Sequence, residues 1–224
     1  MEEKHGAHVI VTIARVMGSG GSFIGKRLAQ RLGCRYLDRE ILVEAARRLR
    51  RDPEALEAFD ERHLTFWERT RMAYAFGAPD SPYAPPPVTV DDKDLFDVQK
   101  TIIQEAAERG PAVIVGRGGF ALLRGLPGHL SVFLHAPLDL RARRIRRLYS
   151  LGSLEEARDM ADQSDRERGH FVKAAVGANW LDPNQYHVCL DTGRLGTGAA
   201  TELLYQAALE VARSVRNKEE PELL

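Results

Sequence analysis

Short apolar runs alternate with longer amphipathic segments along this chain. The runs 8–14, 112–115, 130–134 and 186–190 are rich in β-branched residues, and 35–37 fits a brief fifth strand. Continuous apolar runs are typical of strands buried on both faces, and strands that alternate with helices imply a parallel sheet. We therefore predict an α/β protein, a three-layer α/β/α domain with a five-stranded parallel sheet.

The amphipathic segments predict helices between these strands. In the first of them, Ile24, Leu28 and Leu32 recur every fourth residue, and a glycine then supplies a stop. The predicted helices are 22–32, 39–50, 63–76, 95–109, 138–148 and 198–215. The proline-rich stretch 79–88 can continue neither a helix nor a central strand, so we expect an extended loop there.

The composition narrows the class of protein. The 224 residues fit one domain with an inserted subregion, and 32 basic residues balance 32 acidic ones. The overall charge therefore gives no reason to expect duplex nucleic acid or an anionic membrane as a partner. No segment reaches the ~20 apolar residues that span a bilayer. We expect a cytoplasmic protein, and the sequence does not indicate its oligomeric state.

Several large apolar or sulfur-bearing residues are candidates for the core rather than for a site. We interpret the following as packing residues: Met17, Phe23, Cys34, Trp67, Trp180 and Cys189. Two distant cysteines fit a reducing compartment better than a disulfide framework. No histidine is paired with a cysteine or an acidic residue at zinc-binding spacing, so we assign no metal to the histidines.

A glycine-rich loop joins the first predicted strand to the first predicted helix. Its residues Gly18, Ser19, Gly20 and Gly21 precede Ser22 at the helix start. Glycines allow peptide N–H groups to converge on phosphate oxygens, and the unpaired amides of a helix N-terminus add positive potential. The loop is therefore predicted to bind nucleotide phosphates, although a tight turn would also use glycine. The Ser22 hydroxyl is suited either to cap the helix or to ligate magnesium.

This loop lacks the lysine of a P-loop. A literal match to the motif ends in Lys26, but it would place Phe23 inside the phosphate cradle and interrupt the first helix, so we reject that register. In the register we prefer, Gly21 stands at the lysine position and Arg15 at that of the first glycine. We predict that Arg15 replaces the lysine, because Lys26 lies about 7 Å up the helix.

Four blocks of the sequence carry motifs that occur together in one family. The first contains the glycine loop and the third contains Arg141 and Arg144; the blocks are 13–38, 113–118, 129–144 and 186–192. In this order they resemble the cytidylate kinase-like proteins, relatives of bacterial cytidylate kinase among the nucleoside monophosphate kinases. The resemblance implies a P-loop kinase-like fold that uses ATP and Mg2+ and phosphorylates a nucleoside monophosphate or a similar small phosphate acceptor.

The resemblance also divides this single domain into parts. It implies a core at about 8–38, 94–148 and 186–216, an acceptor-binding insertion at about 39–93, and a lid at about 149–185. Asp38 and Arg39 would belong to the acceptor site, although Asp38 is equally suited to cap a helix.

The remaining site residues are arginines and one aspartate. Arg117 follows a buried strand at the edge of the sheet where ligands bind in such folds, and it would contact substrate; an ordinary surface arginine is the alternative. By resemblance, Arg141 would contact the donor nucleotide from the helix before the lid. From the lid itself, Arg166 would act on the transferring phosphoryl group with Arg15 and Arg117, whereas Asp165 and Arg168 would bind the acceptor. For each arginine of this region, a solvated surface side chain is the alternative.

The chain departs from bacterial cytidylate kinases at three positions. Gly21 replaces the loop lysine, and Val115 and Gly118 stand where an Asp-Gly-Arg-Asp turn has its two aspartates. Loss of one preorganised donor costs about 3 kcal/mol of transition-state stabilisation unless another cation takes its place. Two hypotheses therefore stay open, an ATP-dependent phosphotransferase and a nucleotide-binding regulatory module with weak or no turnover.

Overall fold

A computed structural model describes residues 9–38, 40–49 and 92–219 of the chain. They form a five-stranded, all-parallel sheet with the strand order β2-β3-β1-β4-β5. The elements are β1 (Ile10–Arg15), α1 (Gly21–Leu32), β2 (Arg35–Leu37), α2 (Glu40–Arg48), α5 (Asp92–Glu108), β3 (Ala112–Val115), α6 (Gly119–Leu122), β4 (His129–His135), α7 (Leu138–Tyr149), α8 (Leu154–Val176), η1 (Pro183–Gln185), β5 (Val188–Asp191) and α9 (Thr192–Glu219). The predicted five-stranded parallel sheet is confirmed.

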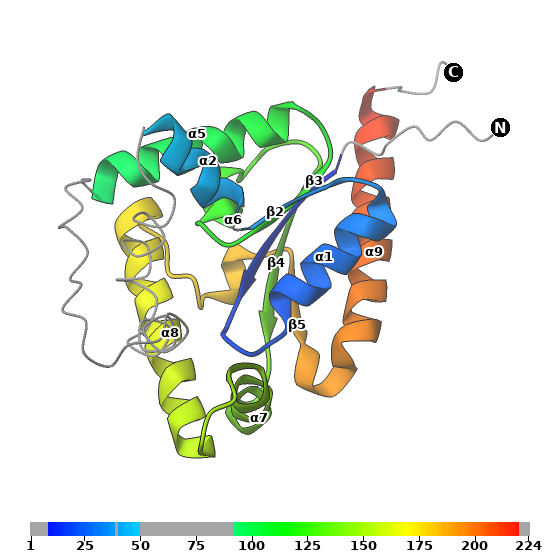
Figure 1. Cartoon of the computed structure of the whole chain (residues 1–224). Helices are drawn as coiled ribbons and strands as arrows, with labels where there is room; N and C mark the ends of the chain where they lie inside the picture. The colour runs from blue at the N-terminus through cyan, green and yellow to red at the C-terminus, as the bar shows by residue number, and fades with distance from the viewer. Residues whose placement is uncertain (1–8, 39, 50–91, 220–224) are drawn as a thin grey trace.

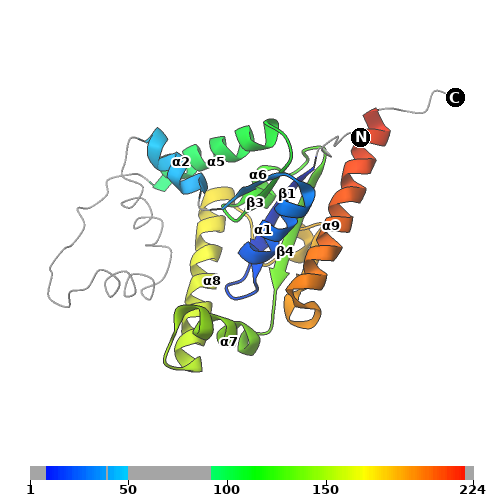
Figure 2. The same ribbon diagram turned by 45° about the vertical axis from the view of Figure 1, so that its right-hand side comes forward.

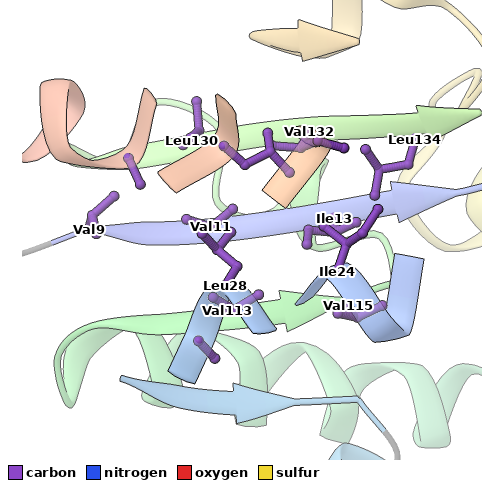
Figure 3. Close-up of a cluster of buried hydrophobic side chains, with 14 of the residues drawn as sticks. Val9, Val11, Ile13, Ile24, Leu28, Val113, Val115, Leu130, Val132 and Leu134 are labelled. Carbon is purple, nitrogen blue, oxygen red and sulfur yellow. The ribbon is translucent and has the colours of Figure 1, made fainter. Parts of the chain in front are cut away.

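One face of the sheet is covered by α1 and α9. Because side chains alternate along a strand, Val11 and Ile13 of β1 point to this face, where they meet Ile24 and Leu28 of α1 (Figure 3). All four side chains are at most 1% exposed, and Leu204 of α9 completes the same cluster. Burial of each such side chain contributes about 1.5–3 kcal/mol, so this layer fixes α1 against the sheet.

The opposite face is covered by α2, α5 and α6. Ile10 of β1 and Ile114 of β3 pack there against Ile41 of α2 and Ile103 of α5. Figures 1 and 2 show α1 and α9 side by side on one face of the sheet, and α2 and α5 packed together at the other. The strands are thus buried on both sides, which explains their continuous apolar sequences.

The carboxyl ends of all five strands lie at one edge of the sheet, because the strands are parallel. The hairpin of α7 and α8 lies at this edge (Figures 1 and 2). Met17, which follows β1, is buried in the core of that hairpin with Ala142, Ile145 and Met160. The loop after β1 is therefore packed between the sheet and the hairpin.

Two described helices, α6 and α8, were not predicted. Three of the five buried residues of α8 are small, namely Ala157, Ala161 and Ser164, so its hydrophobic periodicity is weak. Helix α9 begins at Thr192, six residues before the predicted start, and is interrupted at Gly196. The predicted helix 63–76, the loop 79–88 and Trp67 lie outside the described residues.

The assignments to the core are partly confirmed. Met17 and Trp180 are 8% and 4% exposed, as packing residues should be. The assignment of Phe23 is wrong, because it lies on the outer side of α1, is 53% exposed and has the Arg27 guanidinium over its ring. Cys189 is also exposed rather than buried. Within the described ranges, no helix is both long enough and apolar enough to cross a bilayer.

Candidate functional site

In the structure α1 already begins at Gly21, so the glycine loop spans residues 16–20, and it connects β1 to α1 at the carboxyl edge of the sheet. The first hydrogen bond of α1 runs from the Ile24 N–H to the Gly20 carbonyl, at 3.0 Å. The amides of Gly21, Ser22 and Phe23 come before this bond, and no side chain at Gly20 caps them. The positive end of the helix therefore lies directly at the loop.

The carbonyl groups of this loop are all bonded to the protein. Every carbonyl from Val16 to Gly20 accepts a hydrogen bond from a protein group, and the donors are the Ser19 hydroxyl, Arg141, Arg144, the Thr192 hydroxyl and the Ile24 amide. The shortest of these bonds, 2.7 Å, joins the Thr192 hydroxyl to the Ser19 carbonyl. The negative ends of the loop peptides are thereby neutralised, which favours an anion beside their amides.

The side chain of Arg15 occupies the space that a side chain at position 21 would need. A Cβ atom built on Gly21 would lie 2.6 Å from Cγ of Arg15, and one built on Gly116 would lie 2.3 Å from its Nη1. Both distances are far inside van der Waals contact. Arg15 in this conformation and a residue larger than glycine at position 21 therefore exclude one another. A side chain at position 116 would displace the end of the guanidinium group, and Gly116 also has a φ of +83°, which favours glycine.

The guanidinium group of Arg15 lies at the ends of β2 and β3. Its Nη2 is 3.4 Å from Oδ1 of Asp38, and the two side chains are 20% and 18% exposed. Burial lowers the pKa of Arg15; Asp38 opposes this shift, and the like charge of Arg117 adds to it. Arginine stays protonated nonetheless. The site thus holds two cations that repel each other, and a bound anion would relieve that repulsion.

Asp38 is held by three donors. The Ser22 and Tyr36 hydroxyls each donate to its Oδ2 at 2.9 Å, and Arg15 contacts Oδ1. Burial and the Asp38 charge raise the pKa of Tyr36, so this phenol stays a donor. The carboxylate is turned toward the loop, whereas α2 begins two residues later at Glu40. Arg39, also predicted for this site, lies outside the described residues.

Arg117 has a strained backbone. Its φ is +55°, in the left-handed region that residues with a side chain seldom adopt. Such a conformation costs of order 1–3 kcal/mol and tends to occur at functional sites. Arg117 lies two residues after the end of β3, at the same edge of the sheet as Arg15.

The predicted lid residues divide into two groups. Asp165 of α8 binds Arg141 of α7 at 2.6 Å, accepts from the Met17 amide at 2.8 Å and contacts Arg168 at 3.3 Å. Burial raises the pKa of Asp165, against the opposing effects of that amide and of Arg141. Arg166 is exposed and makes none of these contacts with the loop; it lines a cleft with Trp180, and Asp165 lies at the border between that cleft and the loop.

The sequence analysis did not identify two residues that contact this site, Thr192 and Tyr36. Thr192 directly follows β5 at the carboxyl edge, which was a usable signal. Tyr36 lies within β2, where the sequence indicated only a strand. Among the described residues, no group of three or more His, Cys, Asp or Glu side chains could hold a metal ion alone.

Three comparisons with known proteins bear on this site. Residues 10–194 match the family model of the cytidylate kinase-like family. A cytidylate kinase from Methanopyrus kandleri is 27% identical over 194 residues, which cover 83% of this chain and 86% of that protein.

Two solved structures share the fold. An uncharacterized protein from Eubacterium ventriosum has a TM-score of 0.65 and 21% identity, over 89% of this chain and 98% of that one. Shikimate kinase from Bacteroides thetaiotaomicron has a TM-score of 0.50 and 17% identity, over 90% and 98% of the two chains.

Proposed function

Because the chain belongs to the cytidylate kinase-like family, we propose that it transfers the terminal phosphoryl group of ATP to a nucleoside monophosphate or a similar small phosphate acceptor. Family membership supports ATP-dependent phosphoryl transfer in general, and the acceptor is our inference. One observation carries the proposal: the loop 16–20 binds all its carbonyls to the protein and ends at the uncapped amides of α1. This arrangement suits the phosphates of the donor.

Arg15 is proposed to supply the charge of the missing lysine. Phosphoryl transfer needs positive charge on the equatorial oxygens of the transferring group. Arg15 fills the space above Gly21, at the lysine position, and its guanidinium lies between the loop and the ends of β2 and β3. Arg117, at the end of β3, would add a second cation on the acceptor side.

The state of Asp38 favours an acceptor that is already an anion. An alcohol acceptor needs a base for its proton, but both oxygens of Asp38 already accept from Ser22, Tyr36 and Arg15. A phosphate acceptor needs no such base. We therefore assign Asp38 to holding the site together rather than to proton transfer.

The residues present fit magnesium bound together with nucleotide. The Ser22 hydroxyl and the Asp38 carboxylate, 2.9 Å apart, are hard oxygen ligands. Protein sites for Mg2+ commonly supply one or two such ligands and leave the others to phosphate and water. These two residues would hold the ion, which when bound neutralises charge on the phosphate oxygens.

The proposal is tested by ADP formation from Mg2+-ATP with CMP, dCMP, UMP and AMP in turn, beside calorimetric titration with ATP. We expect one acceptor to give ADP well above the rate of the Arg117→Ala variant. Asp159→Asn, an exposed change on α8, is the matched control and should keep the full rate. If ATP binds but no acceptor gives ADP faster than the Arg117→Ala variant does, the kinase proposal is contradicted. The chain would then be a nucleotide-binding regulatory module.

A further inference from the structure

The α7–α8 hairpin holds Met17, the second residue of the glycine loop, through both its side chain and its peptide groups. The side chain is 8% exposed and packs with Ile145 of α7 and Met160 of α8. The peptide N–H of Met17 donates to Oδ1 of Asp165 at 2.8 Å. Its carbonyl accepts from Nη1 of Arg141 at 3.1 Å. Two consecutive helices, both more than 100 residues away from the loop in the sequence, therefore bind this one loop residue.

Asp165 and Arg141 also bind each other. Nη1 of Arg141 is 2.6 Å from Oδ2 of Asp165, and the two side chains are only 10% and 17% exposed. Together with Met17 they form a closed cycle of three hydrogen bonds. Hydrogen bonds to charged groups are stronger than those between neutral ones, and partial burial strengthens them further. The cycle fixes the orientation of the Met17 peptide.

That orientation sets the geometry of the residues that follow. The next carbonyls, those of Gly18 and Ser19, are held by Arg144, which also lies on α7, and by Thr192 at the start of α9. With Met17 held as well, the peptide units before α1 have little freedom to turn. A preorganised set of amides binds an anion better than a loop that must first become ordered.

We propose that Asp165 and Arg141 are positioning residues, which hold the phosphate loop in its binding shape by gripping the Met17 peptide from α8 and α7. This assignment replaces direct contact with substrate as their role. It rests on the proposed function only in that the loop binds phosphate. The hairpin and the loop then behave as one unit, because separating them would expose Met17 and leave its N–H and carbonyl without partners.

Hydrogen exchange of the Met17 amide tests, without any ligand, whether Asp165 and Arg141 hold the Met17 peptide; we call these contacts the grip. Asp165→Ala removes the acceptor, so exchange at Met17 should become about tenfold faster or more. In Asp165→Asn the side-chain oxygen can still accept from this amide, but the NH2 group then faces Nη1 of Arg141, so only part of the protection should return. Asp159→Asn, on the same helix, should leave the exchange rate unchanged. Equal exchange at Met17 in Asp165→Ala and in the unaltered protein would overturn the proposal.

Calorimetric titration with ATP tests whether the grip shapes the site. We expect the dissociation constant for ATP to rise about tenfold or more in Asp165→Ala, and to recover in part in Asp165→Asn, which keeps the bond to Met17 but not the one to Arg141. Faster exchange at Met17 with unchanged ATP affinity would overturn the positioning role and leave the proposed function intact. Failure of the unaltered protein to bind ATP would instead refute the proposed function, while the exchange experiment would still decide whether the grip exists.

Discussion

The mutual exclusion of Arg15 and a side chain at position 21 makes a sharp prediction. Gly21→Ala adds a Cβ atom 2.6 Å from Cγ of Arg15, so the arginine side chain must move away from the loop. If Arg15 supplies the charge of the missing lysine, this single methyl group should act like the removal of Arg15 itself. The two changes, made together, should then cost little more than either alone.

The magnitude follows from the role proposed for the guanidinium. Removing one preorganised donor from a charge-stabilising site typically costs about 2.7–4 kcal/mol, or 10²–10³-fold in turnover. We expect losses of this size in Arg15→Ala and in Gly21→Ala. The double variant should show about the same loss, so the size of the coupling free energy should equal one such loss, about 2.7–4 kcal/mol. The variant Arg15→Gly with Gly21→Lys, which restores an ordinary P-loop, should regain most of the activity.

The assay is ADP formation with the best acceptor, supported by calorimetric ATP affinity for each variant of the cycle. Gly198→Ala is the matched control, since a Cβ atom at that position in α9 meets open space. Losses that multiply in the double variant would show that the two residues act independently. Full activity in Gly21→Ala would show that Arg15 does not act from the position seen here.

Three further predictions concern stability and the support of the loop. Burial, and to a smaller extent the charge of His187, lower the pKa of His129 from about 6.5 to about 4. The folded protein therefore favours the neutral imidazole, so the free energy of unfolding keeps its full value above pH 6.5 and falls by up to about 3 kcal/mol toward pH 4. Urea unfolding should show less of this loss in His129→Gln. Leu204→Ala should lower the free energy of unfolding by about 2–5 kcal/mol, because Leu204 is fully buried. Leu209 is less buried, so Leu209→Ala should lower it less, and the opposite order of the two losses would contradict this account. Thr192→Val leaves the Ser19 carbonyl without its donor, so the free energy of unfolding should fall by about 1–3 kcal/mol. The affinity for ATP, measured by calorimetry, should fall as well, and an unchanged affinity would show that Thr192 does not support the loop.

The fold could be predicted from the sequence where periodicity was strong. Buried strands such as 112–115 and the regular spacing of Ile24, Leu28 and Leu32 in α1 require no long-range information. Helix α8 could not be predicted in the same way, because its buried positions are mostly alanine and serine. Phe23 was misplaced because it was judged by its hydrophobicity alone, although it lies about 100° or more around α1 from the side marked by Ile24 and Leu28.

The candidate site was predictable in its location and less so in its contacts. Parallel topology brings Arg15, Asp38 and Arg117 to one edge, so their order along the chain was enough to expect them there. The role of Asp165 depends on a hydrogen bond to Met17, 148 positions away in the sequence, and no local pattern encodes it. The close approach of Arg15 to Gly116 likewise exists only once β1 and β3 are paired.

The central claim is that the peptide amides at the start of α1 hold the phosphates of ATP. The most direct measurement is a crystal structure with magnesium and a non-hydrolysable ATP analogue. We expect phosphate oxygens within hydrogen-bonding distance of the Gly20, Gly21 and Ser22 amides, with the Arg15 guanidinium on the terminal phosphate. A triphosphate bound elsewhere on the protein, with this loop free of ligand, would contradict the account.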